Sequence, residues 1–172
     1  VEFTTKGAQF HSVKINDYMS YDSTALYLVK PQMSQYGINL YAGEYINTKD
    51  FVFDVVEHND SVLVMRMPFS NGGYLQQKYT LAAGSYHVSN ELSISGNVIP
   101  RNVSSLDIDW TLTVPRLEKG YKNEKQYSKL DYYFEGDKKP EEIARNRDQA
   151  KSINTNLKWF AFQQQFFSAI LT

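Results

Sequence analysis

The three histidines are the residues of this sequence that are best suited to acid–base or metal chemistry. His11, His58 and His87 lie far apart, each inside or beside a strand-like pattern. None has His or carboxylate neighbours in the arrangement that a metal motif requires. The chain has no cysteine, which excludes disulfides, thiolate zinc sites and cysteine nucleophiles. We therefore expect exposed or singly hydrogen-bonded histidines, and we predict no catalytic residue, no metal site and no cofactor.

Asp107 and Asp109 are the second group that could do chemistry, in the stretch "DIDW". Paired carboxylates can perform acid–base catalysis when their surroundings push the two pKa values apart. Here they alternate with apolar residues such as Ile108 and Trp110 over residues 106–114. Strict alternation is typical of a half-buried strand, so the aspartates are predicted to lie on its solvated face. The sequence therefore predicts that the protein is not an enzyme.

The composition is that of a soluble globular protein rich in strands. Of 172 residues, 42% are hydrophobic and 15% aromatic, and tyrosine leads the aromatics with 13 copies. Aromatic rings favour strands because they fit a pleated, half-buried surface. The formal net charge of −1 argues against a nucleic-acid partner, which would select a basic surface. The chain opens on Val1 inside a strand-like pattern, so we expect a piece of a longer protein.

Strand-like segments separated by turns fill the first two thirds of the chain. Residues 1–15 predict two short strands broken near Gly7, and Asn71-Gly72 predicts a tight hairpin between residues 60–69 and 73–81. Strands at roughly ten-residue spacing indicate a β-sandwich rather than βαβ units.

The segment 116–158 is rich in charge, with 11 Lys and Arg against 8 Asp and Glu. Within it, Pro140 followed by Glu141 and Glu142 is typical of a helix start, so one short helix is predicted around residues 140–151. The basic residues could face anionic lipid headgroups. A solvated helix with loops explains them as well, and we favour that interpretation.

The closing stretch "NLKWFAFQQQFFSAILT", residues 156–172, fits a helix or a strand. As a helix its aromatics cover about half the circumference, but a glutamine falls in the middle of that arc. As a strand it has two partly apolar faces. Periodicity alone leaves both alternatives open.

The same stretch resembles the periplasmic domain of the YidC membrane protein insertases, bacterial members of the YidC/Oxa1/Alb3 family. In this stretch the resemblance lies in one block, which consists of a Trp, a small residue, polar positions and an aromatic pair, as in the family. Its residues are Trp159, Ala161, Gln164, Phe166, Phe167 and Ala169. Three further stretches resemble family segments in the right order: residues 3–22, residues 44–54 and residues 129–139. The likeness spans nearly the whole chain, and the residues of the closing block resemble those of Bacteroidetes sequences.

The resemblance implies a mostly β fold, a two-sheet β-supersandwich similar to galactose mutarotases. It implies one domain over residues 1–172, the N-terminal two thirds of the periplasmic domain, truncated on its C-terminal side. The closing stretch is then one or two buried strands whose partners follow Thr172, with Trp159, Ala161, Phe166 and Phe167 as a structural core motif.

The function that the resemblance implies is that of a non-catalytic module at the periplasmic face of the inner membrane of a Gram-negative bacterium. Expected roles are scaffolding, docking to Sec translocon subunits and transient contact with nascent membrane proteins. The full-length protein would be membrane-embedded and this part of it soluble. Two alternatives remain open: a carbohydrate-binding or mutarotase-like supersandwich domain, and a fragment of a surface lipoprotein or adhesin.

Overall fold

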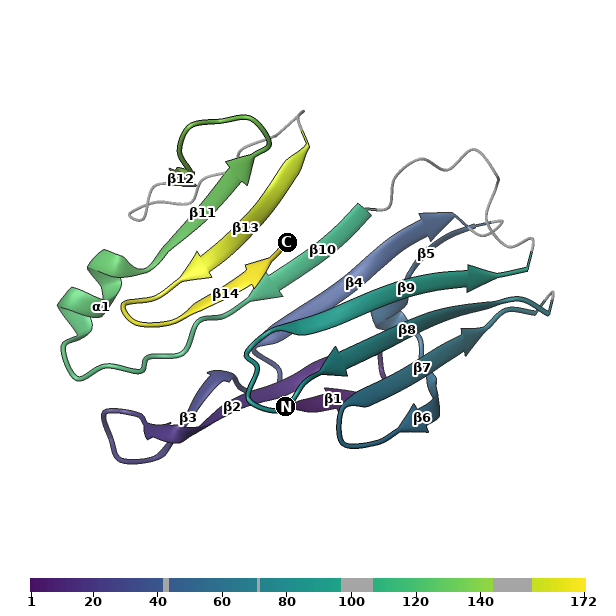
Figure 1. Cartoon of the computed structure of the whole chain (residues 1–172), viewed down its shortest axis with the longest axis horizontal. Helices are drawn as coiled ribbons and strands as arrows, with labels where there is room; N and C mark the ends of the chain where they lie inside the picture. The colour runs from purple at the N-terminus through teal and green to yellow at the C-terminus, as the bar shows by residue number, and fades with distance from the viewer. Residues whose placement is uncertain (42–43, 71, 97–106, 144–155) are drawn as a thin grey trace. The chain divides into compact units, whose positions relative to one another are not determined.

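The computed structural model of the chain describes residues 1–41, 44–70, 72–96, 107–143 and 156–172 (Figure 1). Within these residues the chain forms four sheets, and every strand pair with an assigned register is antiparallel. One α-helix accompanies the strands in the described part of the chain, so the predicted mostly β class is confirmed. The chain divides into two compact units, Val1–His11 with Ser34–Thr111 (unit 1) and Ser12–Met33 with Leu112–Thr172 (unit 2). The assignment of residues 1–172 to a single domain stays a prediction.

Unit 1 contains a four-stranded meander of β6 (Asp54–His58), β7 (Val62–Pro68), β8 (Tyr74–Leu81) and β9 (Val88–Ser95), paired in that order. The β7–β8 pair runs from Val62 opposite Thr80 to Pro68 opposite Tyr74. Gly72, in the connection between them, has φ +86°, a conformation that a side chain disfavours. The hairpin predicted here is confirmed; Asn71 lies outside the described residues.

A second sheet in unit 1 has the order β10-β4-β5, formed by β4 (Ser34–Tyr41), β5 (Tyr45–Asn47) and β10 (Asp107–Leu112). The short 3-10 helix η1 (Thr48–Asp50) follows β5 directly. The strand predicted over residues 106–114 is thus confirmed in its centre. β10 passes out of unit 1 at its last residue, Leu112.

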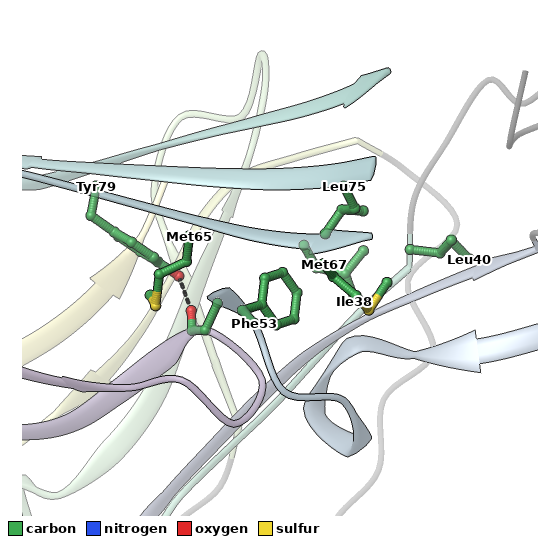
Figure 2. Close-up of a cluster of buried hydrophobic side chains, with 8 residues drawn as sticks. Ile38, Leu40, Phe53, Met65, Met67, Leu75 and Tyr79 are labelled. Atoms are coloured by element: carbon green, nitrogen blue, oxygen red, sulfur yellow. Dashed lines mark hydrogen bonds between the residues drawn. The ribbon is translucent and has the colours of Figure 1, made fainter. Parts of the chain in front are cut away.

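The core of unit 1 lies between these two sheets (Figure 2). Ile38 of β4 meets Met67 of β7 and Leu75 of β8, and all three are at most 3% exposed. Phe53, between η1 and β6, fills the space beside them at 1% exposure. Apolar side chains from facing sheets therefore make unit 1 a sandwich, and burial of this area is the main favourable term in its folding.

Strand β1 (Glu2–Thr4) is followed by β2 (Gln9–Met19), which begins in unit 1 and continues into unit 2. Gly7 separates them with φ +76°, and a Cβ there would lie 2.9 Å from Lys49 Cα. The break predicted near Gly7 is confirmed. In unit 2, β2 pairs with β3 (Ala25–Val29).

Unit 2 also contains a sheet with the order β12-β11-β13-β14. It contains β11 (Lys129–Phe134), β12 (Glu141–Ile143), β13 (Leu157–Gln163) and β14 (Ser168–Leu171). The closing stretch is therefore the β13–β14 hairpin, a pair of strands. The expectation that its partners follow Thr172 is wrong in one respect, because β13 pairs with β11, which precedes it.

The helix predicted around residues 140–151 is wrong at its start. Glu141–Ile143 form β12, opposite Leu130–Tyr132 of β11, and the Tyr132 hydroxyl donates to the Glu141 carboxylate at 2.6 Å. Strand pairing and this hydrogen bond override a local helix preference of a few tenths of a kcal/mol per residue. Residues 144–155 of the predicted helix lie outside the described residues. The α-helix is instead α1 (Tyr121–Tyr127).

Candidate functional site

A hollow of about 410 Å³ in unit 1 is the candidate site. We call it the Trp110 hollow; its lining residues come from β4, η1 and β10 and are Gln35, Lys49, Ile108, Asp109, Trp110 and Thr111. It is formed where β10 lies beside β4, so residues about 60 to 75 positions apart in the chain share one site.

Trp110 is the largest side chain of the hollow and is held in place. Its indole Nε1 donates to the Ser34 hydroxyl at 3.1 Å, and the side chain is half-buried. A tryptophan with its N–H satisfied keeps a fixed ring position and presents a flat apolar surface.

A network of amides and one carboxylate runs across the sheet beside Trp110. Asp109 accepts from Asn39 Nδ2 at 2.9 Å and from Asn47 Nδ2 at 3.1 Å, and Asn47 Nδ2 also donates to Asn39 Oδ1 at 2.7 Å. Asn39 and Asn47 are directly opposite each other in the β4–β5 register. The three side chains thus lie in a row over β10, β4 and β5, and each restricts the rotamer of the next.

Local sequence explains how the network is placed. Asn47 precedes η1, and its Oδ1 accepts from the Lys49 backbone N–H at 3.0 Å, so it caps the short helix. Gly37 of β4 lies against this amide, because a Cβ added at Gly37 would overlap Asn47 Oδ1. Thr48 is fully buried, and its hydroxyl accepts from the Ile38 N–H at 2.9 Å. These contacts fix Lys49 at the edge of the hollow.

The electrostatics of the hollow combine one cation with one carboxylate. Asp109 is hydrogen-bonded by neutral amides, and no described residue forms an ion pair with Lys49. The ammonium of Lys49 is therefore available for a carbonyl or carboxylate oxygen, while Gln35 and Thr111 offer donors and acceptors. Within the described ranges no group of three or more His, Asp or Glu could hold a metal ion. The arrangement suits binding of a polar chain with some apolar surface.

The residues that the sequence singled out for chemistry are distributed unevenly. Asp109 enters the Trp110 hollow, whereas Asp107 is exposed on β10. His11, His58 and His87 are all exposed, as predicted. Ile108, expected on a buried face, is 46% exposed because it lines the hollow.

The four residues of the predicted core motif lie in unit 2 and have different environments. Trp159 on β13 stacks on Tyr133 of β11 at 5.8 Å between ring centroids, and Ala161 is buried at 5% exposure. Phe167 packs against the buried cluster of unit 2, whereas Phe166 is 67% exposed. Their role as a family motif stays a prediction.

Sequence reasoning missed Asn39, Asn47 and Lys49. Asn47 carries a recognisable signal, since Asn at the position before a helical turn is a preferred cap. Nothing local connects Asn39 to Asp109, because the pairing of β4 with β10 brings them together.

The four antiparallel sheets define a mostly β domain, and none of its described helices has the length and apolar character needed to cross a membrane. The sequence profile described as "YidC periplasmic domain" matches residues 1–171, and the chain belongs to this family. As such a domain it lies on the periplasmic side of the inner membrane.

Curated relatives support the assignment of the chain to this family. The membrane protein insertase YidC of Porphyromonas gingivalis is 27% identical over 99% of this chain, and that of Bacteroides fragilis is 30% identical over 99%. The YidC of Cytophaga hutchinsonii is 23% identical over 98%. All three organisms are Bacteroidetes, as the resemblance indicated. The chain spans 28% of the length of these relatives, and no solved structure matches it significantly.

Proposed function

We propose that this domain is a non-catalytic module of a membrane protein insertase and that the Trp110 hollow contacts nascent membrane proteins in transit. Membership of the YidC periplasmic domain family supports the assignment to a membrane protein insertase. The proposal depends mainly on the position of Trp110, which Ser34 fixes beside the Asn39–Asn47–Asp109 network. A flat apolar ring next to amide groups fits an extended polypeptide, which presents apolar side chains and backbone N–H and C=O groups in alternation.

Site-specific photo-crosslinking in the full-length insertase tests this proposal. A benzophenone amino acid replaces Gln35 or Thr111, which are exposed on the rim of the hollow. We expect both positions to crosslink to a radiolabelled nascent membrane protein. Glu91, exposed on β9 of the same unit, is the control position and should give no adduct. Insertion that proceeds with no adduct at positions 35 and 111 contradicts the proposal.

Scaffolding and docking to Sec translocon subunits are the other parts of the proposed role. Affinity capture of Sec subunits on the immobilised chain, with an unrelated β-sandwich of similar net charge as control, tests the docking. Equal recovery on both would count against it.

Carbohydrate binding is a second candidate, because an aromatic ring beside Asp, Asn and Lys side chains also suits a sugar. Mutarotase chemistry is not favoured, since it needs an imidazole and a carboxylate in one cleft. None of the three histidines lines the hollow. Titration with neutral oligosaccharides followed by Trp fluorescence separates the two: a saturable change abolished by Trp110→Ala would favour the sugar.

A further inference from the structure

A second surface, in unit 2, combines exposed aromatics with cations. We call it the Arg116 surface and define it by Tyr21, Arg116, Tyr121, Lys122 and Lys125. Tyr21 is 45% exposed and Tyr121 is 56% exposed. Tyr and Arg are enriched at protein interfaces and Tyr also at membrane–water interfaces, so these side chains indicate a partner.

Arg116 holds the aromatic part of this surface together. Its guanidinium carbon lies 4.3 Å from the ring centroid of Tyr21 and 5.6 Å from that of Tyr121. Arg116 Nε and Nη2 donate to the carbonyls of Glu118 and Lys119 at 3.0 and 2.7 Å. These four contacts fix two exposed tyrosines around one charge before any partner binds, which reduces the entropic cost of binding.

The helix α1 adds outward cations and turns its acid inward. Glu124 is 5% exposed, and its carboxylate accepts from the backbone N–H groups of Leu117 and Glu118 at 2.7 and 3.3 Å. Lys122 and Lys125 are exposed and lie three residues apart, on one face of the helix.

The remaining acids near this surface do not cancel the charge. Segment 116–125 carries four cations and two acids, and one of those acids is the inward Glu124. Asp22, next to Tyr21, accepts from the Thr24 hydroxyl at 2.7 Å and from its N–H at 3.2 Å. Asp22 and Glu118 keep their negative charges, but Arg116, Lys119, Lys122 and Lys125 outnumber them, so the outward face is cationic and aromatic.

We propose that the Arg116 surface binds the anionic phospholipid headgroups of the inner membrane. Tyrosine is enriched at membrane–water interfaces, where its ring reaches the acyl boundary and its hydroxyl stays in water. Each Lys or Arg near an anionic bilayer raises the partition coefficient about fivefold. The charge is complementary, and the domain lies on the periplasmic side of that membrane. The charge pattern of residues 116–158 favours a solvated helix with loops. Over residues 116–125 this interpretation is replaced by a lipid-binding surface.

Cosedimentation of the 172-residue chain with vesicles tests the proposal. We expect binding to vesicles with about 40% phosphatidylglycerol in phosphatidylethanolamine, and its loss without phosphatidylglycerol or in about 0.5 M NaCl. The variant Lys122→Gln with Lys125→Gln should bind about 25-fold more weakly. The matched control, Lys138→Gln with Lys139→Gln, makes the same charge change on exposed residues of unit 2 and should bind like the parent chain. Circular dichroism verifies that both variants fold.

Insertion of the aromatic part is tested separately. A Tyr121→Trp variant should show fluorescence quenching by brominated lipids beyond that of the two native tryptophans, and a Tyr86→Trp variant in unit 1 should not. Equal loss of binding in both lysine variants overturns the proposal, as does equal binding to neutral vesicles. Binding to a poly-glutamate peptide without binding to phosphatidylglycerol overturns it in favour of an acidic protein partner.

Discussion

Gly37 is the residue that lets the amide network of the Trp110 hollow form. Its Cβ-free backbone leaves room for Asn47 Oδ1. We expect Gly37→Ala to lower the free energy of unfolding by about 1–3 kcal/mol, because either the strand or the Asn47 amide must shift. Urea denaturation measures this.

Asn47→Ala provides the matching control for that substitution. Removing the amide also removes the overlap, so the double variant should be more stable than the sum of the two single effects, by at least about 0.5 kcal/mol. Strict additivity would mean that Gly37 is not required for this contact.

Tyr79 makes the free energy of unfolding depend on pH in the alkaline range. Its hydroxyl donates to the Ala8 carbonyl at 2.7 Å, its side chain is 3% exposed, and burial raises the pKa of Tyr79 well above its ordinary value. Below about pH 10 both folded and unfolded states hold the proton. Above it only the unfolded state loses the proton, so the free energy of unfolding falls as pH rises.

We expect Tyr79→Phe to lower stability at neutral pH by about 1–2 kcal/mol, because a buried carbonyl loses its donor. The same variant should flatten the decline in stability between about pH 9 and pH 11 by up to about 1.4 kcal/mol per pH unit. Tyr45→Phe, at an 88% exposed position, should leave that slope unchanged. Equal slopes for all three proteins in urea titrations would contradict this account.

At the scale of elements, β12 depends on side-chain contacts with β11. Lys129 of β11 lies 3.1 Å from the Asp131 carboxylate and 3.2 Å from that of Glu142 on β12. Lys129→Gln should speed amide hydrogen exchange of Glu141–Ile143 by up to about fivefold, since such partly exposed pairs contribute at most about 1 kcal/mol. Exchange in β13 should stay unchanged. Acceleration of both strands alike would show that the pair stabilises the whole sheet instead.

The same elements show how far sequence reasoning reaches. Alternation predicted the strand over residues 106–114, and Asn71-Gly72 predicted the β7–β8 hairpin, because both signals are local. The predicted helix was wrong over Glu141–Ile143, because β11 supplies a strand partner that local propensity does not include. In the Trp110 hollow, Asp109 was noticed, but its partners Asn39 and Asn47 are 70 and 62 residues away. Only the sheet order, which the sequence does not encode locally, brings them together.

On the scale of the whole molecule, the two units have cores of different size. Among the described residues, the apolar cluster of unit 1 has eight buried members, whereas that of unit 2 has three, Ile15, Leu26 and Leu117. Less buried apolar area means less stabilisation, so unit 2 should unfold at a lower denaturant concentration. The chain contains one tryptophan in each unit, Trp110 in unit 1 and Trp159 in unit 2, which allows each to be followed separately.

Single-tryptophan variants make this measurable. Trp110→Phe leaves Trp159 to report on unit 2, and Trp159→Phe leaves Trp110 to report on unit 1. We expect the urea midpoint reported by Trp159 to be the lower one, and far-UV circular dichroism of both variants should show two steps at the same two midpoints. Coincident midpoints by both tryptophans and by circular dichroism would instead mean one cooperative transition. That result would contradict independent units and support the single domain predicted from the sequence.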